Sequence, residues 1–75
     1  MKNVSEINWT TVSSSQITGA YYDSENNSLY LRFRNKSVYS YEDVSLEEFG
    51  SLVDAPSVGK YFYANIKSIK SFKKL

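Results

Sequence analysis

Residues 35–49, "NKSVYSYEDVSLEEF", join a predicted turn, a predicted strand with two tyrosines and the start of a predicted helix. Ser45 lies at the N-cap and Glu48 three residues later, the spacing of a capping box, in which each side chain accepts a hydrogen bond from the other residue's backbone N–H. Val44 and Phe49 occupy the positions of the hydrophobic staple that accompanies such a box. The stretch therefore predicts a helix that begins shortly after a strand.

The chain before this stretch has the pattern of a β-meander. "LYLRFR", residues 29–34, alternates so that Leu29, Leu31 and Phe33 share one face. The polar clusters "DSENNS" and "NKS" predict turns on either side of this segment. We expect a three-stranded antiparallel meander with strands at about 16–23, 28–34 and 37–42.

Proline and serine separate two predicted helices. Pro56 discourages helical geometry at the residue before it, and Ser57 can cap the helix that follows. We expect helices at about 46–54 and 58–68, packed on the meander in an α+β fold. After Ile69, a strand-like tail is an alternative to continued helix. The buried stripe predicted for the first helix comprises Leu46, Phe49 and Val53.

The second helical segment has two contrasting sides at about 100° per residue. The apolar side comprises Val58, Tyr61, Phe62, Ile66, Ile69 and Phe72. The opposite, basic side comprises Lys60, Lys67, Lys70 and Lys74, with Tyr63 among them. Residues 42–54 carry five acids and no base, and residues 55–75 carry five lysines and no acid. Because a helix N-terminus favours acidic residues, the acidic run has a structural explanation, and the basic side is the candidate binding surface.

Length and composition restrict the classes of function. With 75 residues the chain is one small domain, 1–75, in which 1–11 form a loosely packed N-terminal segment. The chain has no cysteine and no histidine, which removes thiolate and imidazole metal ligands and the usual general base near neutral pH. We therefore expect no enzyme activity, no catalytic residues, no metal and no cofactor.

The sequence also predicts where the protein resides. No apolar run is long enough to cross a bilayer, and the N-terminus "MKNVSEINW" lacks the apolar core of a secretory signal. We expect a cytoplasmic protein without membrane contacts, located in the host cytoplasm if a phage encodes it.

Two registers of the second hairpin give the central tyrosines opposite environments, because a one-residue slip turns a strand's side chains to the other face. A two-residue loop, Asn35-Lys36, pairs Arg32 with Tyr39 and places Tyr41 away from the core. The exposed face would then be an aromatic platform with basic neighbours, on which bases of single strands can stack. It would comprise Tyr30, Arg32, Arg34, Tyr39 and Tyr41.

A three-residue loop, Asn35 to Ser37, instead pairs Phe33 with Tyr39 and places both tyrosines in the core. Two-residue loops strongly prefer glycine at the second position, where this chain has lysine. The chain also has few large apolar residues for a core. Both registers remain open, and these two observations favour the buried arrangement.

The order of several short segments resembles the KTSC domain, a small module at the C-terminus of some lysyl-tRNA synthetases that also occurs as stand-alone bacterial or phage proteins. The resemblance covers roughly residues 12–72. Its segments are "VSSSQI", "YYD", "LYLRF", "YSY", "DV" and "APSVGKYFYANIK". The positions that match the family signature are Tyr39, Tyr41, Ser57, Gly59, Tyr61 and Phe62.

Two positions depart from the family pattern. Family members often have glycine in the turn before the tyrosines, where this chain has Asn35 and Lys36. They commonly have proline after the valine, where this chain has Ser45. The resemblance implies RNA binding only through the association with synthetases, and it provides no catalytic residues.

Two functional hypotheses follow. The first is a binding module for RNA or single-stranded nucleic acid, for which the structural alternative is a merely solvated basic helix face. Its candidate residues are Arg32, Arg34, Lys60, Tyr63, Lys67, Lys70 and Lys74. The second is a protein–protein adaptor or inhibitor, or a self-associating chain. The high aromatic content and the separated acidic and basic segments motivate this second hypothesis.

Overall fold

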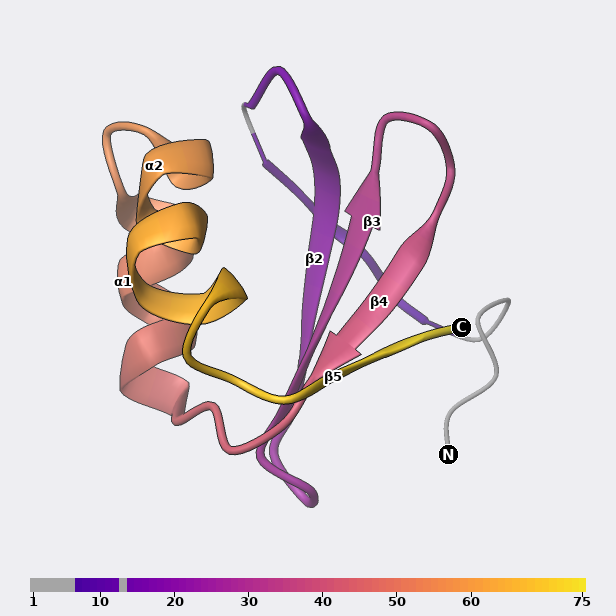
Figure 1. Cartoon of the computed structure of the whole chain (residues 1–75), viewed down its shortest axis with the longest axis vertical. Helices are drawn as coiled ribbons and strands as arrows, with labels where there is room; N and C mark the ends of the chain where they lie inside the picture. Colours follow the sequence, from indigo (N-terminus) through magenta and orange to yellow (C-terminus); the bar gives the residue numbers. More distant parts are fainter. Residues whose placement is uncertain (1–6, 13) are drawn as a thin grey trace.

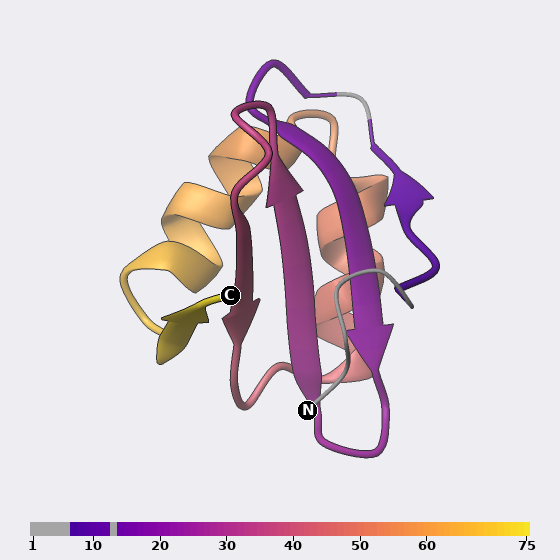
Figure 2. The same cartoon turned by 90° about the vertical axis from the view of Figure 1, so that its right-hand side faces the viewer.

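The computed structural model describes residues 7–12 and 14–75, which form a five-stranded antiparallel sheet and two helical segments. The strands follow the order β1-β2-β3-β4-β5, so each strand pairs with its neighbour in the chain. Figures 1 and 2 show both helical segments on one face of this sheet. The elements are β1 Thr10–Thr11, β2 Ile17–Asp23, β3 Ser28–Phe33, β4 Val38–Tyr41, α1 Leu46–Asp54, α2 Val58–Phe62, the π-helix η2 Tyr63–Lys67 and β5 Phe72–Lys74.

The predicted α+β class is confirmed, and the predicted three-stranded meander is the centre of a larger sheet. The strand count was too low because both edge strands are very short. Strand β1 has two residues and β5 has three, and all five residues are exposed. Such strands are too short to show alternation in the sequence, so only their pairing with β2 and β4 identifies them.

The β3–β4 loop has three residues, Arg34 to Lys36. The Phe33 N–H donates to the Ser37 carbonyl over 2.8 Å, and the Lys36 N–H donates to the Phe33 carbonyl over 2.9 Å. Lys36 has a φ of 71°, as the last position of a three-residue hairpin loop requires. Leu31 therefore pairs with Tyr39.

This register matches neither predicted pairing. It lies two residues from the predicted three-residue alternative, and a slip of two residues leaves each side chain on its original face. Tyr39 and Tyr41 consequently lie on the side of the sheet that carries Leu29 and Leu31, as the buried arrangement predicted. The exposed platform of tyrosines and arginines does not form.

The core lies between the sheet and the helices. Leu29 and Leu31 of β3 are fully buried, and so are Leu52 of α1 and Ile66 of η2. The chain from 1 to 11 was predicted to pack loosely; residues 1–6 lie outside the described part, whereas Ile7 is buried. No helix in the described part of the chain is long and apolar enough to cross a membrane.

The start of α1 agrees with its predicted capping box. The Glu48 N–H donates to Ser45 Oγ over 3.1 Å, and the Ser45 N–H donates to Glu48 Oε1 over 2.9 Å. The predicted burial of Leu46 is wrong, since this side chain is 66% exposed. Leu52 is buried instead, and at 100° per residue it lies about 120° around the helix from Leu46.

The second helical segment ends close to the predicted bound, since a helix was expected at about 58–68, and β5 agrees with the alternative of a strand-like tail after Ile69. Five α-helical residues are followed by the five-residue η2, which ends at Lys67. Ile69 and Phe72 were predicted to extend the apolar side, but they are 66% and 57% exposed. The wider π-turn changes the angular spacing of residues, and the chain then turns into β5.

We expect Lys36→Gly to stabilise the protein by about 1 kcal/mol, because glycine adopts positive φ without the steric cost that a side chain incurs. Urea unfolding would measure this change as a higher denaturation midpoint. Asn35→Gly is the control, since Asn35 has no positive φ and its Oδ1 accepts from the Ser37 N–H over 2.9 Å. This control should destabilise the protein. Equal effects of the two substitutions would contradict the proposed loop geometry.

Candidate functional site

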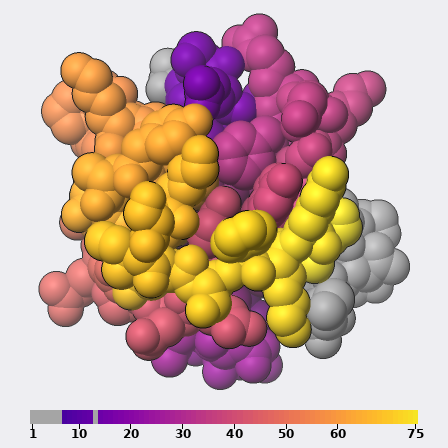
Figure 3. Space-filling model, viewed as in Figure 1, coloured from indigo at the N-terminus to yellow at the C-terminus, as the bar shows by residue number. Residues whose placement is uncertain are grey.

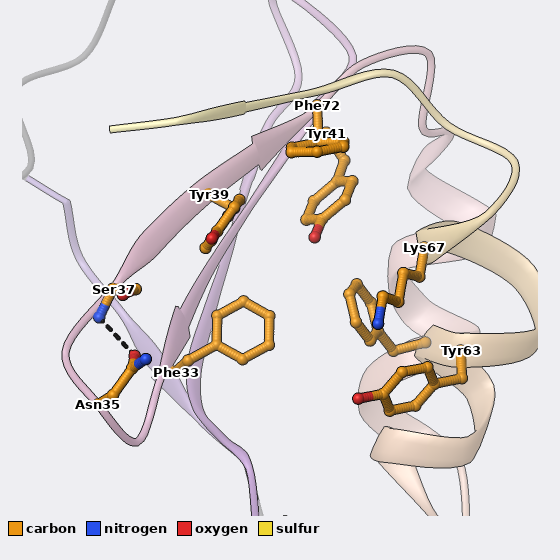
Figure 4. Close-up of a pocket in the computed structure, with 9 residues that line it drawn as sticks. Phe33, Asn35, Ser37, Tyr39, Tyr41, Tyr63, Lys67 and Phe72 are labelled. Carbon is orange, nitrogen blue, oxygen red and sulfur yellow. Dashed lines mark hydrogen bonds between the residues drawn. The ribbon is translucent and has the colours of Figure 1, made fainter.

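A pocket lined mainly by aromatic rings opens between the sheet and the second helical segment. Its volume is about 340 Å³. Figure 3 shows atoms of the sheet between the orange helical segment and the yellow C-terminal strand, and Figure 4 shows the pocket in detail. This aromatic pocket is lined by Phe33, Asn35, Ser37, Tyr39, Tyr41, Phe62, Tyr63, Lys67 and Phe72.

Strand geometry brings several of these rings together. Alternation along β4 places Tyr39 and Tyr41 on one face, and their ring centroids lie 6.5 Å apart. Phe72 pairs with Tyr41 across the β4–β5 ladder, and its ring centroid lies 5.8 Å from Tyr39 and 5.9 Å from Tyr41. Phe62 of α2 contacts Phe33 at 5.7 Å and Tyr41 at 5.4 Å. These five rings thus come from β3, β4, α2 and β5, and Tyr63 and Lys67 of η2 complete the pocket wall.

The Tyr41 side chain is 4% exposed, yet its hydroxyl points into the pocket between Phe33 and Lys67 (Figure 4). Within residues 7–12 and 14–75, this hydroxyl has no hydrogen-bond partner and is not enclosed by protein atoms. Burial, with smaller contributions from the nearby phenols of Tyr39 and Tyr63, raises the pKa of Tyr41 to about 12. At neutral pH the pocket therefore holds a protonated hydroxyl that has no partner among the described residues.

Two predicted binding residues, Tyr63 and Lys67, line the pocket. The Lys67 ammonium lies 4.5 Å from the centroid of the Tyr63 ring, which is a cation–π contact. The Tyr63 hydroxyl donates to Gln16 Oε1 over 3.1 Å, which orients the ring. Lys74 pairs with Tyr39, and residues directly opposite in a ladder share a face. Lys74 therefore lies on the pocket side of the sheet.

The two predicted arginines lie apart from the pocket. Arg32 pairs with Val38 on β4, and its guanidinium lies 5.0 Å from the centroid of the Trp9 ring. Its Nε also donates to Thr18 Oγ1 over 3.1 Å. The Nε of Arg34 donates to the Ser15 carbonyl over 2.9 Å. Both guanidinium groups thus contact the protein itself.

Lys70 and Lys60 also lie outside the aromatic pocket. Lys70 Nζ donates to the Asp43 carbonyl over 2.6 Å and forms an ion pair with Glu48 at 3.2 Å. Lys60 is exposed and lines a shallow groove on the other side of Tyr63. The predicted basic surface is therefore not continuous. Of its residues, Tyr63 and Lys67 line the aromatic pocket, and Lys74 lies on the same face of the sheet.

The residues that match the family signature have two kinds of role. Tyr39, Tyr41 and Phe62 line the pocket. Ser57 caps α2, because its Oγ accepts from the Lys60 N–H over 3.3 Å. Tyr61 is half-buried against the core. Gly59 is half-buried, and a Cβ there would meet Ser14 Oγ at an ordinary 3.7 Å.

Sequence reasoning missed Phe33 and Phe72 as site residues. Phe33 could have been found, because in the three-residue-loop alternative it shares a face with the two tyrosines. Phe72 was counted on the apolar side of the second helical segment, and the alternative of a strand-like tail after Ile69, with which β5 agrees, did not specify its pairing with Tyr41. Among the residues that the structure describes, no group of three or more His, Cys, Asp or Glu residues could hold a metal ion.

Comparisons with known proteins agree on one family. A family model described as the KTSC domain matches residues 13–72. The structure is similar to the crystal structure of a KTSC domain protein from Yersinia pestis, with a TM-score of 0.87 and 30% sequence identity. That similarity covers 92% of this chain and 97% of the Yersinia pestis chain. A comparison with curated proteins finds no match.

The raised pKa of Tyr41 predicts a change of stability at high pH. The folded state holds this phenol proton more tightly than the unfolded state, whose tyrosine pKa is about 10. The stabilisation is therefore present below pH ~10 and is lost as the pH rises toward the folded value of about 12. We expect the unfolding free energy of the wild type to fall more steeply over this range than that of Tyr41→Phe. If urea unfolding shows that the unfolding free energies of the two proteins fall in parallel over this pH range, the prediction is wrong.

Proposed function

The chain belongs to the KTSC domain family, and we propose that it is a non-catalytic module that binds single-stranded nucleic acid at the aromatic pocket. The observation that carries this proposal is the presence of six aromatic rings and Lys67 around one open pocket, with Lys74 on the same face of the sheet. Single-strand binding sites combine these two features, because bases stack on rings and cations neutralise phosphates.

The arrangement suits an unstacked base better than a duplex. A pocket of about 340 Å³ offers rings in several orientations, whereas a duplex presents its phosphates and groove edges rather than free base faces. Lys67 lines the pocket, and the exposed Lys74 extends from β5. A base in the pocket would leave its flanking phosphates near these two cations.

A protein partner is the second candidate, and a specific observation favours it. Ile69 and Phe72 expose large apolar side chains in and beside β5, which is an edge strand of the sheet. Edge strands can pair with a strand of another chain. A partner held in this way would not depend on Lys74 and would tolerate salt better than phosphate contacts do.

The contribution of Lys74 can be isolated because Lys73 precedes it on the same strand and faces the other way. Lys73 pairs with Ser40, whereas Lys74 pairs with Tyr39. We expect a fluorescent single-stranded oligonucleotide to bind the wild type at low salt and to lose affinity as salt is added. Lys74→Gln should reduce the slope of log K against log[salt] by about 0.7, the value for one phosphate contact on a single strand.

Lys73→Gln is the matched control, and its slope should equal that of the wild type. Equal losses from the two substitutions would indicate a general charge effect and contradict a directed phosphate contact. If no single strand binds at low salt, the proposed function is wrong.

Phe72 provides a test of stacking that leaves the core intact, since its ring is largely exposed. We expect Phe72→Ala to weaken single-strand binding by about 1–3 kcal/mol, the range for loss of one base–aromatic stack. Fluorescence anisotropy would measure the affinity. Ile69→Ala is the control, because Ile69 is also an exposed apolar residue but does not line the pocket. Equal losses of oligonucleotide affinity from the two substitutions would contradict base stacking on Phe72.

A further inference from the structure

We propose that the groove on the other side of Tyr63 is a phosphate-binding subsite, which holds the backbone of a single strand whose base lies in the aromatic pocket. This inference rests on the proposed function and extends its ligand beyond one nucleotide. The groove has a volume of about 480 Å³ and lies between the segment before β2 and the start of α2. The polar lining of this serine groove comprises Ser14, Ser15, Gln16, Ser57, Lys60 and Tyr63.

Tyr63 connects the serine groove to the aromatic pocket, because its side chain lines both. Gln16, which accepts the proton of the Tyr63 hydroxyl, lines the groove, whereas Lys67, whose ammonium lies over the Tyr63 ring, lines the pocket. The two sites are therefore neighbours that share one wall. A strand whose base stacks in the pocket has to pass only this side chain for a phosphate further along the strand to reach the groove.

The polar groups of the groove are available as hydrogen-bond donors. Ser14 Oγ accepts from two backbone N–H groups, over 3.3 and 3.4 Å, which occupy both of its lone pairs. Ser57 Oγ accepts from the Lys60 N–H over 3.3 Å. Neither serine hydroxyl donates a hydrogen bond within residues 7–12 and 14–75. The Oε1 of Gln16 accepts from Tyr63, so the NH₂ group of Gln16 remains as a donor.

The only formal charge in the groove is positive. Among the described residues that line it, none carries a carboxylate, and the Lys60 ammonium forms no ion pair within the described part of the chain. A phosphate is negatively charged, and its oxygens accept hydrogen bonds from lysine, serine and glutamine side chains. The serine groove offers these three kinds of donor together. It thus matches the backbone of a strand, whereas the rings of the aromatic pocket match a base.

Gly59 gives access to the groove for a test, because it lines the groove and lies in the first turn of α2. A Cβ at Gly59 would meet Ser14 Oγ at an ordinary 3.7 Å, and the first turn of a helix favours an acidic residue. Gly59→Glu therefore places a carboxylate in the groove without a steric clash. Because this carboxylate would repel a phosphate, we expect single-strand affinity to fall about tenfold in fluorescence anisotropy at low salt.

Gly50→Glu is the matched control. It makes the same substitution in helix α1 and changes the net charge equally, and a Cβ at Gly50 would meet no atom within 4 Å. Its effect on affinity should be about twofold or less, because exposed charges far from the ligand are screened. Lys60→Gln should reduce the slope of log K against log[salt] by about 0.7, the value for one phosphate contact on a single strand. Equal losses from the two glutamates and an unchanged slope for Lys60→Gln would overturn the subsite.

A second measurement uses only the wild type, so it does not depend on the folding of a variant. Amide NMR would compare a short thymidine strand with the same strand carrying uncharged methylphosphonate linkages. We expect the amides of Ser15 and Gly59 to shift with the charged strand and much less with the uncharged one, whereas Tyr41 should shift with both. A charged strand that shifts Tyr41 but not Ser15 and Gly59 would overturn the subsite and leave the proposed function standing. Absence of shifts with either strand at low salt would overturn the proposed function itself.

Discussion

The register of the β3–β4 hairpin determines which way Tyr39 and Tyr41 face, and the aromatic pocket depends on it. A slip of one residue would turn both rings to the opposite face of the sheet. Tyr41 would then leave the core, and the pocket would lose two of its six rings. The three-residue loop with Lys36 at positive φ holds the observed register, although a lysine side chain is strained in this conformation. The positive φ of Lys36 is therefore locally unfavourable, but it fixes which face of β4 carries Tyr39 and Tyr41.

The same side chains contribute to the core and to the pocket, as the small size of the domain requires. Tyr41 and Phe62 belong to the buried cluster and also line the pocket. Strand β5 forms one side of the pocket, and the segment that precedes it is linked to α1 by the ion pair of Lys70 with Glu48. The hydrogen bond from the Ser45 backbone N–H, together with the Lys70 ammonium, lowers the pKa of the Glu48 carboxyl. One carboxylate therefore caps α1 and contacts the segment that leads into Phe72.

The proposed binding mode differs from the one that the charge pattern suggested. A uniform helix would have aligned the lysines along one side, but η2 and β5 distribute them over different parts of the molecule. Lys70 contacts α1, Lys67 lies over Tyr63, and Lys74 lies opposite Tyr39. Affinity in the proposal comes mainly from rings, with a small number of cations placed around them. Sensitivity to aromatic substitutions, together with a salt dependence set by a small number of phosphate contacts, is the consequence of this arrangement.

The sequence by itself determined the features that depend on neighbouring residues: the alternation of the meander, the capping box of α1, and the end of α1 before Pro56. It also favoured the buried face for Tyr39 and Tyr41. A hairpin loop with an odd number of residues places these rings on the face of Leu29 and Leu31, whatever the exact position of the loop. The tertiary structure alone decided the pairing of β1 and β5, the position of Phe72 and the contact of Lys70 with Glu48. These features join residues far apart in the chain, and their energies depend on surfaces that exist only after the sheet and helices have packed.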